Sequence, residues 1–161
     1  MRNKIVVGKS KIHGKGIFVN QNIKKGEEIF TIKGPKMFKI NKNTRDALAH
    51  PDWIGFKMNT WIDPIPPYKY VNHSCNPNCG IKGKLKVIAL KNIKEEEEIT
   101  LDYSTTEMDE LWKMKCSCGA KNCRKIIKSI ESLSPKLYKR YFPNIPKDFI
   151  KIYEKKLLTT Y

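Results

Sequence analysis

Three short motifs occur in a fixed order along this chain and restrict its fold more than any other feature. The first is Asn72–Asn78 with the sequence Asn-His-Ser-Cys-Asn-Pro-Asn, the second is Leu101-Asp102-Tyr103, and the third places three cysteines within residues 116–123. Amide, imidazole, carboxylate and phenol groups form hydrogen bonds in several directions. A compatible fold must therefore bring these polar groups and thiols into defined positions.

The length of 161 residues favours one domain with a single hydrophobic core, helped by a metal ion if the cysteines bind one. In the first two thirds, short apolar runs are separated by glycine or asparagine turns, which predicts a mostly β fold. The predicted strands are Ile5 to Val7, Ile17 to Val19, Ile29 to Ile32, Leu85 to Leu90 and Glu98 to Leu101.

One segment is repeated, because the sequence of Asn22–Ile29 recurs in similar form as Asn92–Ile99. Two similar turns that lead into strands would explain the repeat, whereas a solenoid needs several stacked units. Glu96 occupies the place of Gly26 in the second copy. We therefore expect the second turn to avoid a positive backbone φ angle, which favours glycine.

Helical patterns are confined to two places. Residues 44–50 are predicted to form a short helix that is capped by Thr44 and stopped by Pro51. Beyond Cys123, Pro146 lies where a first helical turn could begin. The predicted C-terminal helix would pack its apolar stripe on the parent domain, rather than cover a site or bind a partner. This stripe comprises Phe149, Ile150, Tyr153 and Leu157.

The chain is strongly basic, with 32 lysines and arginines against 16 acidic residues and a formal net charge of +16. Such a balance favours anionic surroundings, which include nucleic acid, chromatin and acidic protein surfaces. However, only four of the basic residues are arginine, the residue suited to bidentate recognition of phosphates and bases. A solvated lysine-rich surface is therefore favoured over a dedicated nucleic-acid groove, although nucleic-acid contact stays open.

The N-terminal residues contain no secretory apolar stretch, and no window is apolar over the length needed to span a bilayer. We therefore expect a soluble intracellular protein. In that setting, five cysteines with three in one cluster indicate metal binding before disulfide formation.

Gly14-Lys15-Gly16 places two glycines around one residue, so the backbone can approach a ligand closely. A hairpin turn is the alternative, and the third glycine of a dinucleotide fingerprint is missing. Adjacent Asn72 and His73 can hold a polar ligand from several directions, whereas the alternative is a polar turn in which Asn76-Pro77-Asn78 supplies the bend.

Taken together, these motifs resemble those of SET-domain protein lysine methyltransferases that carry the cysteine-rich post-SET segment. The resemblance covers Ile5 to Arg124. It implies an α+β, mostly β fold of several small sheets, with a C-terminal segment threaded beneath a loop as a pseudoknot that joins the first two motifs. It also divides the chain into a SET domain at 1–108, a post-SET segment at 109–128 and a helical extension at 129–161.

The resemblance assigns binding of S-adenosylmethionine to the backbone of Gly14, Lys15 and Gly16, to Asn72 and His73, and to Tyr103. Tyr103 would also be the catalytic residue that orients the amine of the target lysine. Methyl transfer needs a neutral amine, which burial and the nearby sulfonium favour, and alignment does most of the remaining work.

Two positions depart from the family pattern. Leu101 stands where many members have phenylalanine or tyrosine, so we expect a channel that tolerates more than monomethylation. A second active-site tyrosine is also expected, but none of the nearby aromatic residues aligns with it. These residues are Trp53, Phe56, Trp61 and Tyr68.

Cys116, Cys118 and Cys123 supply three thiolates, and a structural zinc ion binds four ligands. The resemblance assigns the fourth position to Cys75 in preference to Cys79, which would tie the post-SET segment over the cofactor. Losing the zinc should then disorder this segment. The alternatives are unmetallated thiols or a redox pair.

The sequence thus predicts a protein-lysine N-methyltransferase that uses S-adenosylmethionine and one zinc ion. Its substrate would be a histone, another chromatin protein or an unrelated protein, and it would act in the cytoplasm or at chromatin, including a host nucleus. Glu107, Asp109 and Glu110 would line the peptide groove if the substrate is a basic tail. The alternative is a noncatalytic, zinc-stabilised module that binds protein or nucleic acid.

Overall fold

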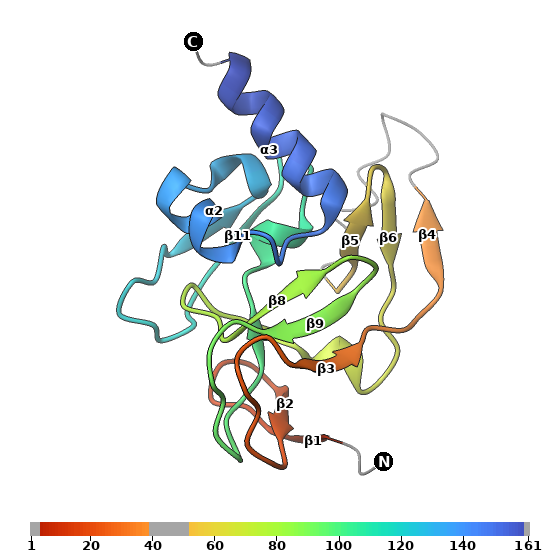
Figure 1. Cartoon of the computed structure of the whole chain (residues 1–161), viewed down its shortest axis with the longest axis vertical. Coiled ribbons are helices and arrows are strands. Elements are labelled where there is room, and N and C mark those ends of the chain that lie inside the picture. The colour runs from red at the N-terminus through yellow and green to blue at the C-terminus, as the bar shows by residue number, and fades with distance from the viewer. Residues whose placement is uncertain (1–3, 39–51, 160–161) are drawn as a thin grey trace.

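Small sheets make up most of the protein in a computed structural model, which describes residues 4–38 and 52–159 (Figure 1). All five predicted strands are confirmed, and the predicted helix at residues 44–50 lies outside the described residues. The strands are β1 Ile5–Lys9, β2 Lys15–Val19, β3 Glu28–Thr31, β4 Lys36–Phe38, β5 Ile54–Lys57, β6 Thr60–Ile62, β7 Asn72–His73, β8 Cys79–Lys82, β9 Lys86–Ala89, β10 Thr100–Leu101, β11 Lys113–Lys115 and β12 Ile126–Lys128.

These strands form five sheets within the described residues. Two have three strands, in the orders β3-β9-β8 and β4-β6-β5, and three are pairs, β1 with β2, β7 with β10, and β11 with β12. The β7–β10 pair is parallel, whereas the other pairings are antiparallel. The predicted fold class, mostly β with several small sheets, is confirmed.

The main hydrophobic core lies between these sheets and is built from their branched aliphatic residues. Side chains such as Ile17 on β2, Ile81 on β8 and Val87 on β9 are fully buried. Neighbouring residues on these strands, such as Lys15, Lys82 and Lys86, are exposed. In these three strands buried residues stand next to one another, and the exposed lysines stand at the strand ends.

The two repeated segments form matched turns that bind each other. Ile23 and Ile93 exchange two backbone hydrogen bonds, with N···O distances of 2.8 and 2.9 Å. In each turn a glutamate, Glu27 or Glu97, accepts a hydrogen bond from the backbone N–H three residues earlier. The prediction of two similar turns that lead into strands is confirmed.

The prediction for Glu96 is wrong, because its φ angle is 67°, close to the 85° of Gly26. The backbone N–H of Glu96 donates to the carbonyl oxygen of Val19 at 2.8 Å, and Glu97 caps the same turn. These contacts hold the turn in the left-handed region although its residue carries a Cβ atom. Tertiary hydrogen bonds thus outweigh the local preference.

From residue 130 onwards the described chain is helical, with one 3₁₀ turn and two α-helices above the sheets (Figure 1). Helix α3, Lys147–Thr159, begins directly after Pro146, as predicted. Its Phe149 and Tyr153 are buried in a second hydrophobic cluster, against which Ile150 also packs, so the predicted packing is confirmed for these three residues, whereas Leu157 is 37% exposed. Within the described residues, no helix is long and apolar enough to cross a membrane.

Helix α2, Pro135–Tyr141, was not predicted, although its N-terminus has a readable signal. Ser134 accepts a hydrogen bond from the backbone N–H of Leu137 at 3.4 Å, and proline occupies the first turn. Serine before proline is a typical helix start. The 3₁₀ turns are η1 Tyr68–Tyr70, η2 Tyr103–Thr106 and η3 Ile130–Ser132.

Candidate active site

The parallel pair β7–β10 brings the first two motifs together. Asn72 lies opposite Thr100, His73 lies opposite Leu101, and the backbone N–H of Ser74 donates to the carbonyl oxygen of Leu101 at 2.9 Å. Asp102 follows directly on this pairing. The predicted meeting of Asn72–His73 with Asp102–Tyr103 is therefore present.

The side chain of Asn72 ties the N-terminal glycine segment to this pair. Its Nδ2 atom donates to the carbonyl oxygens of His13 and Lys15, at 3.2 and 3.0 Å, and to Glu98 Oε1 at 2.7 Å. In the described part of the chain no partner contacts its Oδ1 atom, which leaves one acceptor for a ligand. A Cβ atom at Gly16 would lie 2.3 Å from Glu98 Oε1, so a larger residue there would displace the carboxylate that binds Asn72.

Glu98 was not predicted as a site residue, because it ends a run of four glutamates that is typical of a solvated surface. In the structure Glu98 accepts hydrogen bonds from Asn72 and from Ser10 Oγ, the latter at 2.8 and 2.9 Å. It therefore joins the N-terminal hairpin to β7. The available signal was its place at the start of a predicted strand, Glu98 to Leu101.

A cavity of about 280 Å³ lies beside these residues. Asn72, His73 and Tyr103 line it, together with Ile12 and His13 from the N-terminal segment and residues 114–118 from the cysteine segment. Gly14, Lys15 and Gly16 are not among the lining residues, and the Lys15 ammonium lies 5.3 Å from the centre of the Tyr70 ring. The structure thus gathers three of the six predicted cofactor residues, Asn72, His73 and Tyr103, around one cavity.

A second, narrower cavity of about 30 Å³ lies next to the first, because the two share lining residues. Asp52 and Tyr103 line both cavities, and Glu107 lines the narrow one. Four aromatic residues also line the narrow cavity, which we call the aromatic channel, together with Ile54, Lys69, Val71 and Thr106; the aromatic residues are Trp53, Trp61, Tyr68 and Trp112. Tyr103 is therefore a wall residue that the two cavities share.

The hydroxyl of Tyr103 donates to the carbonyl oxygen of Val71 at 2.7 Å, and its backbone N–H donates to His73 Nδ1 at 3.2 Å. Burial raises the pKa of Tyr103, and the nearby carboxylates of Asp52 and Glu98 raise it further. The phenol keeps its proton near neutral pH. It is therefore suited to orient a polar group rather than to remove a proton from it.

His73 is a neutral ring in this arrangement. Burial lowers the pKa of His73 to about 4, although the charge of Asp102 opposes this shift. Because Nδ1 accepts the hydrogen bond from Tyr103, the proton lies on Nε2, which is 3.3 Å from the Cys75 sulfur. The 3.8 Å approach of Asp102 to His73 is thus a contact with a neutral ring, not an ion pair.

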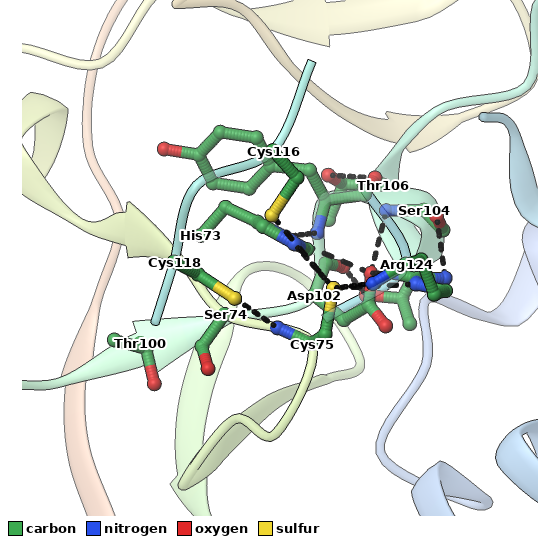
Figure 2. A network of polar contacts seen from close by, with 12 residues as sticks. His73, Ser74, Cys75, Thr100, Asp102, Ser104, Thr106, Cys116, Cys118 and Arg124 are labelled. Atoms are coloured by element: carbon green, nitrogen blue, oxygen red, sulfur yellow. Dashed lines mark hydrogen bonds and ion pairs between the residues drawn. The ribbon is translucent and has the colours of Figure 1, made fainter. Parts of the chain in front are cut away.

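Asp102 is the centre of a buried polar network that sequence reasoning missed (Figure 2). Its Oδ1 atom accepts from Arg124 Nη2 at 2.5 Å and from the backbone N–H of Ser104 at 3.1 Å. The Arg124 guanidinium also donates to Ser104 Oγ at 3.2 Å. Arg124 follows the last cysteine of the cluster, so this network joins the cysteine segment to the turn that carries Tyr103.

The cysteines gather around Cys75. Its sulfur lies 3.8 Å from that of Cys116, and the sulfurs of Cys116 and Cys123 are 3.7 Å apart. Zn–S bonds of about 2.3 Å in a tetrahedron place two sulfurs about 3.8 Å apart. The ligand atoms of His73, Cys75, Cys116 and Cys118 all lie within 4.8 Å of one another, a group in which Cys123 is not included.

The donor chemistry also fits thiolates. The backbone N–H and the Nε atom of Arg124 point to the Cys75 sulfur, at 3.3 and 3.5 Å. Although burial raises the pKa of Cys118, hydrogen bonds from the backbone N–H groups of Cys75 and Ala120 lower it to about 7. Such N–H···S contacts typically surround thiolate ligands of a metal. Cys79, by contrast, lies in the main core.

The two departures from the family pattern have different surroundings. Leu101 is buried in the main core and is not among the residues that line either cavity. Of the upstream aromatic residues, Trp53, Trp61 and Tyr68 line the narrow cavity, whereas Phe56 packs against the main core. Trp112, from the cysteine segment, completes the aromatic wall and was not predicted.

With this geometry established, comparison with known proteins identifies the family. The family model of the SET domain matches residues 14–104, which is more than half of the chain. The chain therefore belongs to the SET-domain family, as the motifs predicted.

The similar proteins are much longer than this chain. Histone-lysine N-methyltransferase 2B of Homo sapiens is 32% identical over 136 residues, covering 75% of this chain and 5% of that protein. Histone-lysine N-methyltransferase trithorax of Drosophila virilis is 34% identical over 136 residues, covering 75% of this chain and 4% of that protein. The chain thus spans about a twentieth of these relatives.

A solved structure shares the fold. The crystal structure of KRYPTONITE in complex with mCHG DNA and SAH matches with a TM-score of 0.60 and 21% sequence identity. The match covers 78% of this chain and 29% of that chain.

Proposed function

We propose that this protein is a protein-lysine N-methyltransferase that uses S-adenosylmethionine. The observation that carries this proposal is the position of Tyr103, which lines both the cavity beside Asn72 and His73 and the narrow aromatic channel. A methyltransferase needs a cofactor and an acceptor to reach one point from two sides. The names of the similar SET proteins, histone-lysine N-methyltransferases, support the same reaction.

The larger cavity would hold the cofactor, which supplies a methyl group on a sulfonium. Asn72 has an amide oxygen available to accept a hydrogen bond, and its amide nitrogen fixes the side chain against the N-terminal segment. The neutral ring of His73 adds no positive charge beside a cationic cofactor. Gly14–Gly16 would act by shaping the backbone that follows Ile12 and His13, which line the cavity.

The narrow channel would hold the side chain of the target lysine. Burial among its aromatic residues would disfavour the ammonium form, whereas the Asp52 and Glu107 carboxylates in the same wall would first attract the charged amine. The protonated phenol of Tyr103 would orient the amine, because its hydroxyl is fixed by the bond to Val71. Orientation of the reacting atoms supplies much of the rate enhancement in such a reaction.

The proposed substrate is a histone or another chromatin protein, so the protein would act in the nucleus or at chromatin. The names of the similar proteins support this substrate class. Glu107 is buried and lines the channel, so Asp109 and the exposed Glu110 are the better candidates for contact with a basic peptide. The similar solved structure is a complex with DNA, which keeps nucleic-acid contact open as an alternative.

We also propose that one zinc ion is held by Cys75, Cys116, Cys118 and Cys123, and that 1–108, 109–128 and 129–161 are the functional divisions of the chain. The sulfur spacing and the N–H···S contacts support the zinc ligands. Trp112 packs with Cys75 and Cys116, so an ordered metal site would also stabilise the aromatic channel.

The zinc assignment is tested by metal analysis of Cys75→Ser and Cys79→Ser. Both cysteines are 1% exposed, but only Cys75 belongs to the cluster. The parent and Cys79→Ser should retain one zinc ion per chain, whereas Cys75→Ser should lose it. Equal zinc content in the two folded variants would overturn the assignment.

The enzymatic function is tested by transfer of labelled methyl groups from S-adenosylmethionine to histones and cell-extract proteins. Tyr103→Phe is compared with Tyr153→Phe, because the Tyr153 hydroxyl also donates to a backbone carbonyl, that of Leu133 at 3.0 Å. We expect Tyr103→Phe to lose at least about 100-fold in kcat and Tyr153→Phe to stay active. Parental activity in Tyr103→Phe would contradict the catalytic assignment, and a folded parent that neither binds nor uses the cofactor would favour the noncatalytic module.

A further inference from the structure

Helix α2 lies outside the matched SET region and places one buried hydroxyl group in the site. Tyr141 ends this helix, lies 37 residues beyond the end of the match at residue 104, and is 1% exposed. Its hydroxyl donates to Asp102 Oδ2 at 3.0 Å. The proposed catalytic residue, Tyr103, directly follows Asp102.

Asp102 receives hydrogen bonds from three separate parts of the chain. Tyr141 binds Oδ2, whereas Arg124 and the backbone N–H of Ser104 bind Oδ1. Because Asp102 is 2% exposed, its carboxylate depends on these donors in place of water. The Ser104 bond makes Asp102 the cap of η2, the turn that begins at Tyr103.

The extension that carries Tyr141 is firmly attached to the SET region. The backbone N–H of Ile81 donates to the Asn144 carbonyl oxygen at 3.0 Å, and Arg140 donates to the side chain of Asn76. A Cβ atom at Gly55 would lie 2.7 Å from Phe149 Cζ, so helix α3 approaches β5 closely. Tyr141 is therefore presented by an anchored element.

We propose that Tyr141 is a positioning residue for Tyr103, and that the C-terminal extension stabilises the active site through this residue. The Tyr141 hydroxyl fixes one oxygen of Asp102, which leaves the other oxygen to hold Ser104 and Arg124. The turn that begins at Tyr103 is thereby held against the two cavities. The catalytic part of this inference rests on the proposed methyltransferase function.

Tyr141→Phe tests this positioning role, because it removes the hydroxyl and keeps the buried ring. Tyr153→Phe is the matched control in the same extension: its side chain is also 1% exposed, and its hydroxyl binds the Leu133 carbonyl oxygen away from Asp102. In the full chain, Tyr141→Phe should lower kcat about tenfold and leave the KM for S-adenosylmethionine within about twofold. Tyr153→Phe should keep the parental kcat.

Amide hydrogen exchange supplies a readout that does not require activity. Tyr141→Phe should speed exchange at the amides of Tyr103 and Ser104 by about fivefold or more, since their turn loses a buried anchor. Tyr153→Phe should leave those two amides unchanged. If the parent transfers no methyl group, the methyltransferase proposal fails, whereas the exchange comparison still decides whether Tyr141 holds the turn.

Two results would overturn the positioning role. One is unchanged exchange at Tyr103 and Ser104 in Tyr141→Phe. The other is an equal loss of kcat in Tyr141→Phe and Tyr153→Phe, which would reduce the role of Tyr141 to general stability.

Discussion

The two repeated turns share a backbone geometry but end in glutamates with different surroundings. Glu28, in the first copy, is exposed and lies 2.8 Å from the Lys86 ammonium on the surface. Glu98, at the same place in the second copy, accepts hydrogen bonds from Asn72 and Ser10 at the edge of the larger cavity.

The difference arises from the strand that each turn enters. After Glu28 the chain enters β3, which pairs with β9, whereas after Glu98 it enters β10, which pairs with the strand that carries Asn72. The same sequence pattern thus places a glutamate on the surface in the first copy and a glutamate that supports the site in the second copy. Tertiary pairing, not the turn itself, assigns the function.

The largest effect on this comparison should come from Glu98→Ala, with Glu28→Ala as its matched control. Glu98→Ala leaves the Asn72 amide with only its backbone acceptors, so its side chain is less firmly oriented toward the cavity. We expect about tenfold weaker binding of S-adenosylhomocysteine by calorimetry, since hydrogen bonds to a charged group contribute roughly 1.5–3 kcal/mol. Glu28→Ala should bind as the parent does. Equal affinities of the two variants would break the comparison.

A smaller effect is expected from the asparagines that connect the turns. Asn92 Oδ1 accepts from the backbone N–H of Lys25 at 2.9 Å, and Asn22 Oδ1 accepts from that of Glu95 at 3.0 Å. Each turn is therefore capped by the asparagine of the other. Asn22→Ala and Asn92→Ala should each lower the free energy of unfolding by about 1 kcal/mol in urea titrations. A large difference between them would show that the two copies do not stabilise each other reciprocally.

Effects of the same size or smaller are expected at the left-handed residue of each turn. An alanine at Gly26 meets nothing within 4 Å, so Gly26→Ala should cost about 1 kcal/mol through backbone strain alone. Glu96→Gly should stabilise by only about 0.5 kcal/mol, because glycine relieves strain but loses more entropy on folding. Chemical denaturation measures both changes. Destabilisation by Glu96→Gly would mean that the glutamate side chain makes a compensating contribution.

The sequence predicted the site better than the contacts that hold it. The motifs at Asn72–Asn78 and Leu101–Tyr103 could be connected through their resemblance to the SET pattern, although strands of two residues carry no periodic signal. Arg124 and Tyr141 were missed, because nothing local indicates that either residue reaches Asp102. Long-range hydrogen bonds of this kind are visible only once the chain is folded.

Rules of local sequence preference gave a wrong prediction where tertiary contacts opposed them. Elsewhere such rules applied, but the prediction did not use them. The positive φ angle of Glu96 is held by its hydrogen bond to Val19 and by the bonds between Glu97 and Lys94, which a comparison with Gly26 does not reveal. Helix α2, by contrast, begins with a serine cap and a proline that could have been recognised. The helix predicted after Pro146 had both a start signal and an apolar stripe.

The most direct test of the two-cavity arrangement is a crystal structure of the full chain with S-adenosylhomocysteine and a histone peptide that contains lysine. We predict that the cofactor product occupies the cavity beside Asn72 and His73 and that the lysine side chain enters the aromatic channel, with both reaching Tyr103. A cofactor product bound elsewhere, or a lysine that approaches from a different face, would contradict the assignment of Tyr103 as the point of methyl transfer.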